Sequence, residues 1–176
     1  ERRILTVDSL SASMGEGLLV YYAAEQRRAG KSIDEVSDWL IANRLHLCHW
    51  FTVDDLFHLK RGGRISAATA LVGTVLGVKP VLHVDDEGRL VAVGKVRGRR
   101  KSLEALVDEM EKTCTRPTEQ VVFISHGDSI EDAQYVERLV RERLNVKDVQ
   151  INYVDPVIGA HSGPGTIALF FMGAQR

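Results

Sequence analysis

The sequence predicts an α/β (α+β) chain built as a two-layer sandwich, with a largely antiparallel sheet and helices on one face. The main observation is the order of segments after residue 78, which runs strand, strand, helix, strand, helix, strand, strand. A short Asp86-Glu87-Gly88 turn joins the first two of these strands and indicates an antiparallel hairpin. The 176 residues, 44% of them hydrophobic and 27% charged, are typical of a globular chain with one domain, or one domain and a piece of another.

The N-terminal part predicts a strand, two helices and a second strand. Residues 4–9 form a short apolar strand, and residues 18–24 are too apolar for a surface helix, so they are expected to pack in a core. Ser32 and Glu35 have the spacing of a capping box, which starts the next helix. Residues 49–53 are β-branched and aromatic, which is typical of a strand.

The central stretch carries two adjacent glycines, Gly62 and Gly63, with cations on both sides. Glycine lets the backbone turn through positive φ or approach another group closely. Residues 67–76 are apolar nearly all round and predict a helix that is buried or forms one wall of an apolar cavity. The alternative is an ordinary glycine bend with solvated charges between two helices.

The remaining elements follow from hydrophobic periodicity and from turn residues. We expect hairpin strands at 79–85 and 89–97, a helix through 103–114, a strand at 120–125, a helix through 133–144, and strands at 149–153 and 166–172. Asp155 and Pro156 turn the chain into a loop at 159–165, rich in glycine and proline. We expect this loop to expose backbone amides around His161 and Ser162, which together can hold a carboxylate or a phosphate. For His161 alone, a histidine satisfied by local hydrogen bonds is an equally good interpretation.

Several functional classes are disfavoured by spacing and charge. A nucleophile elbow is absent because Ser162 comes one position late, and residues 73–77 lack the Lys-Ser/Thr of a phosphate-binding P-loop. His46, Cys48 and His49 have metal-ligating side chains, but no second cluster completes a coordination shell. A formal net charge of −1 argues against a general nucleic-acid binder. No stretch approaches the ~18 consecutive apolar residues needed to cross a membrane.

Two segments together resemble one known family. The Lys-Arg-Gly-Gly-Arg-Ile segment at 60–65, followed by an apolar helix and a Lys-Pro strand, and the Gly-Ala-His-Ser-Gly-Pro-Gly segment at 159–165 are similar to motifs of the DegV family, a group of bacterial fatty-acid-binding proteins. The resemblance covers essentially the whole chain. It implies two domains that hold one long-chain fatty acid between them, and a separate kinase that converts the bound acid to acyl-phosphate for phospholipid synthesis.

The resemblance also implies a division of the chain and a set of site residues. Residues 1–47 would be the strand–helix remnant of the N-terminal domain with its connecting helices, and residues 48–176 the C-terminal domain. The N-terminal carboxylate-binding motifs of the family do not occur here, so the chain is expected to be a partial protein. The resemblance implies that His161 and Arg97 lie near the fatty-acid head group and the kinase-facing surface. From the residues themselves we expect Arg64, Ser162 and Gly163 in the same head-group region, and an apolar slot for the acyl chain that is lined by Ile65, Leu71, Val75, Leu76 and Ile158.

The leading hypothesis is therefore a cytoplasmic lipid-binding protein with no catalytic residue, metal or cofactor of its own. Its expected partners are a long-chain fatty acid and the catalytic subunit of a fatty acid kinase, without nucleic acid and without stable membrane insertion. Cys48 and Cys114 lie far apart and show no disulfide framework, which favours a reducing cytosol. The alternatives are a hydrolase or acyl-transfer enzyme that uses His161, and a nucleic-acid module that uses the basic residues 97–101.

Overall fold

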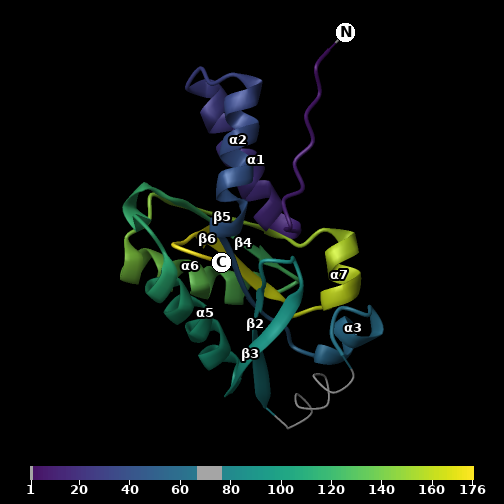
Figure 1. Cartoon of the computed structure of the whole chain (residues 1–176). Helices are drawn as coiled ribbons and strands as arrows, with labels where there is room; N and C mark the ends of the chain where they lie inside the picture. The colour runs from purple at the N-terminus through teal and green to yellow at the C-terminus, as the bar shows by residue number, and fades with distance from the viewer. Residues whose placement is uncertain (1, 67–76) are drawn as a thin grey trace.

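The computed structural model describes residues 2–66 and 77–176 and centres on one six-stranded sheet (Figure 1). The strand order is β3-β2-β1-β6-β4-β5, and every neighbouring pair is antiparallel except β4 and β5. The predicted largely antiparallel sheet is therefore confirmed. The strands are β1 (Leu47–Thr52), β2 (Val78–Val84), β3 (Leu90–Arg97), β4 (Val121–His126), β5 (Asp148–Tyr153) and β6 (Ile167–Met172).

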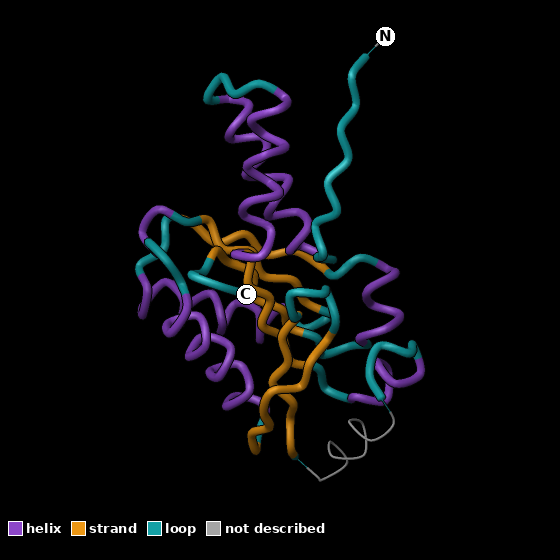
Figure 2. The backbone as a smooth tube through the Cα atoms, in the orientation of Figure 1, coloured by secondary structure: helices purple, strands orange, loops and turns teal. Residues whose placement is uncertain are grey.

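Helices cover both faces of this sheet (Figures 1 and 2). The α-helices are α1 (Ser13–Arg28), α2 (Ile33–Asn43), α3 (Leu56–Arg61), α5 (Arg99–Thr113), α6 (Ile130–Leu144) and α7 (Pro156–Ser162), and two short 3-10 turns are η1 (Arg44–His46) and η2 (Pro117–Glu119). Helices α5 and α6 form the predicted second layer on one face. Helix α1 packs on the opposite face, against β1, β4 and β6.

The apolar sequence of β6 is explained by this two-sided cover. Leu169 and Phe171 point toward α5 and α6, whereas Ala168 and Phe170 belong to the core beneath α1. Side chains alternate between the two faces of a strand, so a strand that is buried on both sides has a continuous apolar run. The two cores lie back to back, with β1 and β6 between them.

The N-terminal elements differ from the sequence prediction. Residues 4–9 are extended but form no strand, and they run away from the sheet (Figure 2). In the N-terminal half of α1, Leu18 and Leu19 are buried against the sheet. This is the apolar segment expected to enter a core, and the sheet supplies that core. Helix α2 begins with the predicted Ser32–Glu35 capping box.

The segment expected as a loop at 159–165 is largely helical. Asp155 is the N-cap of α7 and accepts hydrogen bonds from the amides of Val157 and Ile158 at 2.9 and 3.1 Å. Pro156 occupies the first turn, where its missing N–H costs nothing. The Asp-Pro pair thus starts a helix instead of a turn, and His161 and Ser162 lie in its last turn. The apolar helix predicted at 67–76 lies outside the described residues.

Candidate functional site

A cavity of about 260 Å³ opens on the α1 face of the sheet. Its walls come from the start of α1, the end of α3 and the residue Arg64 beyond it, the β2–β3 hairpin, α7 and the strands β1, β4 and β6. The lining residues are mostly apolar, with a few polar side chains at two places. The apolar lining includes Phe51, Leu59, Val84, Leu90, Val154, Val157, Ile158, Ala168 and Phe170.

Four of the residues predicted from the sequence line this cavity: Arg64, Ile158, His161 and Ser162. Arg64 is exposed, and its Nη1 donates to the carbonyl oxygen of Gly62 at 2.7 Å. Ser162 is buried, and its hydroxyl donates to the carbonyl of Ile158 at 2.9 Å, which leaves its oxygen lone pairs as acceptors. The structure therefore joins a guanidinium and an imidazole to one apolar space, although these groups are nearly 100 residues apart in the chain.

The two glycine-containing segments pack against each other through histidines. A Cβ at Gly62 would overlap Nδ1 of His161, so the imidazole occupies the space that the missing side chain leaves. A Cβ at Gly163 would lie 2.6 Å from Cδ2 of His58, so a second histidine rests on a second glycine. We call these two contacts the reciprocal histidine–glycine packing of α3 and α7. It fixes the position of His161 relative to the turn at Gly62.

The remaining predicted site residues occupy other positions. Gly163 does not line the cavity, and its amide donates to the carbonyl of Gly159 at 2.8 Å. The amide of Gly165 donates to the carbonyl of Gly127 at 2.7 Å. The expectation of exposed amides in this segment is thus wrong at both glycines, because the last turn of α7 and the return to β6 use them. Ile65 packs against the core beneath α1, and Leu71, Val75 and Leu76 lie outside the described residues.

Arg97 is also placed away from the cavity. It ends β3 and pairs in register with Val78, whereas Leu90, at the other end of the same strand, lines the cavity. Arg99, one of the basic residues 97–101, is partly buried; its guanidinium pairs with Asp132 and donates to the carbonyl of Gly165 at 2.6 Å. Arg99 is therefore a tether between α5, α6 and the segment after α7.

A second polar group inside the cavity was not predicted from the sequence. Ser13, Ser125 and His49 line its wall, and the hydroxyl oxygens of Ser13 and Ser125 lie 3.2 Å apart. Nε2 of His49 lies 2.5 Å from the hydroxyl of Ser11. Burial lowers the pKa of His49 to about 3, so the imidazole is neutral at physiological pH. Strand periodicity places His49 on the face of Leu47 and Phe51, but only the fold brings the serines to it.

The cavity wall at the start of α1 has a strained backbone that a distant arginine holds. Leu10 and Ser13 have φ values of 49° and 57°, in the left-handed region that non-glycine residues rarely adopt. The guanidinium of Arg176 donates to the carbonyls of Leu10 at 2.9 Å and Ser9 at 3.5 Å. It also donates to the carbonyls of Arg44, Leu47 and Asp85. Arg176 thus ties the 9–13 segment to β1 and to the β2–β3 hairpin.

A comparison with protein families decides what this chain is related to. Residues 1–174 match the family model described as "Uncharacterised protein, DegV family". The chain belongs to the DegV family. The resemblance seen in its two glycine-containing segments is therefore confirmed over nearly the whole sequence.

Individual DegV relatives support the same assignment. A DegV domain-containing protein of Clostridium perfringens is 51% identical over 173 residues, which cover 98% of this chain and 60% of the relative. A solved structure of a Thermus thermophilus protein, described as showing fatty acid binding of a DegV family protein, is 32% identical with a TM-score of 0.86 and covers 97% of this chain and 61% of its own. The chain thus spans about 60% of the length of these relatives.

A more distant structure shows the fold alone. A Streptococcus pneumoniae protein described as Fatty Acid Kinase (Fak) B3 loaded with linoleic acid has a TM-score of 0.87 at 23% identity, over 97% of this chain and 60% of that protein. The DegV fold persists at this identity. Within the described part of this chain, no helix is both long and apolar enough to span a membrane.

Proposed function

We propose that this chain contributes the C-terminal part of a site for one long-chain fatty acid. The observation that carries the proposal is the composition of the cavity: an apolar slot that has Arg64, His161 and Ser162 in its wall. A carboxylate removed from water requires charged or hydrogen-bonding partners, and an acyl chain requires a dry apolar surface. The cavity offers both.

In this proposal the acyl chain lies along Phe51, Leu90, Ile158 and Phe170, and the carboxylate faces Arg64 and His161. The guanidinium and the imidazole supply N–H donors, in place of the amides of Gly163 and Gly165 that the fold already uses. The fatty-acid-binding description of the Thermus thermophilus relative supports the assignment.

The proposal extends to the whole protein. Residues 1–47 would belong with an N-terminal domain that carries further carboxylate-binding groups, and residues 48–176 would form the C-terminal domain. The family resemblance supports a cytoplasmic protein whose bound fatty acid is phosphorylated by a separate kinase. The described residues do not favour a hydrolase built on His161, because the hydroxyl of the adjacent Ser162 donates to a main-chain carbonyl.

The contact between Ser11 and His49 does not revive the hydrolase alternative. A serine–histidine pair acts as nucleophile and base when a third group orients the imidazole and the histidine pKa lies near the working pH. Nδ1 of His49 is buried without a hydrogen-bond partner among the described residues, and its pKa is lowered to about 3 by burial. The pair therefore lacks an orienting group and is a weak base.

The test is palmitate binding by calorimetry to the full-length protein and to two matched variants. Arg64→Met should weaken binding by about 10-fold or more, because a charge-assisted hydrogen bond is worth roughly 1.5–3 kcal/mol. Arg97→Met removes a matched positive charge at the end of β3 that lies away from the cavity, and it should leave the palmitate affinity unchanged. Equal affinity of parent and Arg64→Met, or an equal loss in both variants, would show that the head group lies elsewhere.

A further inference from the structure

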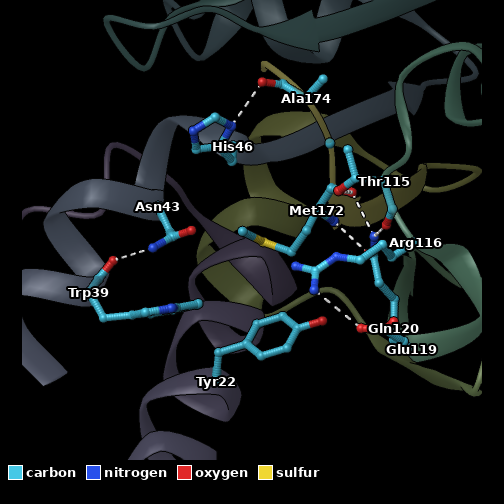
Figure 3. Close-up of a pocket in the computed structure, with 11 residues that line it drawn as sticks. Tyr22, Trp39, Asn43, His46, Thr115, Arg116, Glu119, Gln120, Met172 and Ala174 are labelled. Carbon is cyan, nitrogen blue, oxygen red and sulfur yellow. Dashed lines mark hydrogen bonds and ion pairs between the residues drawn. The ribbon is translucent and has the colours of Figure 1, made fainter.

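The molecule has a second cavity, of about 450 Å³, that shares no lining residue with the first. It lies between the α1–α2 helices on one side and the end of β6 with η2 on the other (Figure 3). Its lining includes Tyr22, Trp39, Asn43, Arg116, Gln120 and Met172. Its volume falls in the range of about 300–1,000 Å³ that is typical of small-molecule sites.

Aromatic rings form one side of this second cavity. The rings of Tyr22 and Trp39 have centroids 5.7 Å apart and planes tilted by 45°. None of the residues of α2 is fully buried, and Trp39 is half-buried. Part of the indole is therefore available to a ligand. The thioether of Met172 lies opposite these rings (Figure 3), and sulfur packs favourably against aromatic groups. This arrangement suits a flat ring better than a flexible alkyl chain.

The polar walls are held in place by internal hydrogen bonds. The buried amide of Gln120 donates to the carbonyls of Thr115 and Met172 and accepts from the amide of Met172 at 2.8 Å. Nδ2 of Asn43 donates to the carbonyl of Trp39 at 2.8 Å, and Nδ1 of His46 lies 2.9 Å from the carbonyl of Ala174. Because these bonds fix the side chains, the cavity is formed before any ligand arrives.

Two polar groups remain directed into the open space. Figure 3 shows the carboxamide oxygen of Asn43 and the guanidinium of Arg116 on opposite sides of the space above Tyr22. Arg116 has φ 45° and ψ 58°, a left-handed backbone that is rare for a non-glycine residue. Strained residues of this kind cluster at ligand sites. This left-handed residue stands immediately before Pro117 and lines the cavity.

The charge of the site limits the ligand to a single negative charge. Arg116 pairs with Glu119 at 3.3 Å, and both side chains are highly exposed, so the pair is weak and a carboxylate can join or replace Glu119. A di- or trianionic phosphate would meet one guanidinium and the repulsion of Glu119. A monoanionic carboxylate meets the least repulsion from Glu119, can take the place of Glu119 on the guanidinium, and has the planar geometry that arginine binds through two parallel hydrogen bonds.

We propose that this cavity is a binding site for a small aromatic carboxylate, with its ring against Tyr22 and Trp39 and its carboxylate on Arg116. A donor group across the ring from the carboxylate would reach the carboxamide oxygen of Asn43. The site is independent of the fatty-acid cavity, and neither assignment rests on the other.

The experiment uses the fluorescence of Trp39. The 176 residues contain two tryptophans, and Trp50 stacks on His83 outside both cavities, so a Trp50→Phe variant leaves Trp39 as the only indole of this chain. The 176-residue chain with Trp50→Phe is titrated with 4-hydroxybenzoate, which supplies a ring, a carboxylate and an opposite donor. We expect saturable quenching that oleate does not displace. Absence of saturation at millimolar 4-hydroxybenzoate, or displacement by oleate, would overturn the proposal.

Matched variants and probes test the individual contacts. Arg116→Gln in the same background should weaken the binding of 4-hydroxybenzoate by about tenfold or more. Arg138 is an exposed arginine on α6 outside the cavity, so Arg138→Gln should not change the binding. Cyclohexanecarboxylate, which has the charge without the flat ring, and 4-hydroxybenzamide, which has the ring without the charge, should both bind at least tenfold more weakly. An affinity for either analogue equal to that for 4-hydroxybenzoate, or an equal loss of 4-hydroxybenzoate affinity in both arginine variants, would contradict the assignment.

Discussion

The adjacent glycines Gly62 and Gly63 should fail in different ways when each is replaced by alanine. Gly62 has φ −74°, which any residue adopts, but its missing Cβ makes room for Nδ1 of His161. Gly63 has φ +70°, which favours glycine, but nothing lies within 4 Å of the position a Cβ would take. One glycine is required for close approach and the other for backbone conformation.

The expected magnitudes follow from these two geometries. Alanine at Gly63 should lower the free energy of unfolding by about 1–2 kcal/mol, the cost of a left-handed conformation for a residue with a Cβ, without displacing His161. Alanine at Gly62 forces the imidazole back by roughly 1 Å to reach an ordinary contact distance. This movement costs little stability because the imidazole is the free end of a side chain. It should nevertheless reduce the affinity for palmitate about 10- to 100-fold if His161 donates a hydrogen bond to the carboxylate.

The assay pairs calorimetric titration of palmitate with thermal unfolding for both variants of the full-length protein. Gly63→Ala should reduce stability with affinity retained, and Gly62→Ala should reduce affinity with stability nearly retained. In a His161→Ala background, Gly62→Ala should cause no further loss, because the group that it displaces is already gone. Parental affinity in Gly62→Ala, or the same loss of affinity in both glycine variants, would refute the role given to the histidine–glycine packing.

Three further changes test other parts of the structure. Burial lowers the pKa of His49 from 6.5 to about 3, so the stability that depends on a neutral imidazole is present above pH 6.5 and is lost as the pH falls toward 3. His49→Gln should reduce this dependence of the free energy of unfolding on pH, measured by urea unfolding. An unchanged pH dependence would contradict the burial argument. Arg176→Lys should lower the free energy of unfolding by about 1–3 kcal/mol and speed amide hydrogen exchange at residues 9–13. Exchange at the parental rate would show that these residues keep their conformation without Arg176. Arg97 is exposed at the end of β3, away from the cavity, and we propose that it faces the kinase, so Arg97→Glu should slow kinase-dependent phosphorylation while palmitate affinity is retained. Lost affinity with unchanged turnover would contradict this position for the kinase.

Much of the fold was predictable because local patterns and tertiary structure agree. The hairpin around Gly88, the two amphipathic helices now seen as α5 and α6, and the apolar run of β6 each carry a periodicity that matches their final environment. The prediction failed where an isolated dipeptide has two solutions. Asp155-Pro156 can end a strand in a turn or cap a helix, and the contact between α3 and α7 that accompanies the helix is not visible in the sequence.

The candidate site was predictable only where a motif carries several of its side chains. Arg64, His161 and Ser162 stand out beside their glycines, and all three line the cavity. Ser13 and Ser125 could not be found, because serines are common and these two are more than 100 residues apart in sequence. Arg176 had no local signal either, since its partners are main-chain carbonyls from three separate segments, at residues 9–10, 44–47 and 85.

The two glycine-containing segments depend on each other, which explains why their residue types occur together in one chain. His161 needs the bare backbone of Gly62, and Gly163 leaves the space that His58 fills, so a side chain at either glycine would displace the histidine that rests against it. Displacement at either contact would change the position of His161 on α7 relative to Arg64 at the end of the other segment. In a fatty-acid site those two residues share one carboxylate, and a charge-assisted hydrogen bond weakens steeply as its atoms separate. The reciprocal packing therefore sets the distance between the two head-group donors, and the affinity for the carboxylate should depend on both glycines as much as on the charged residues themselves.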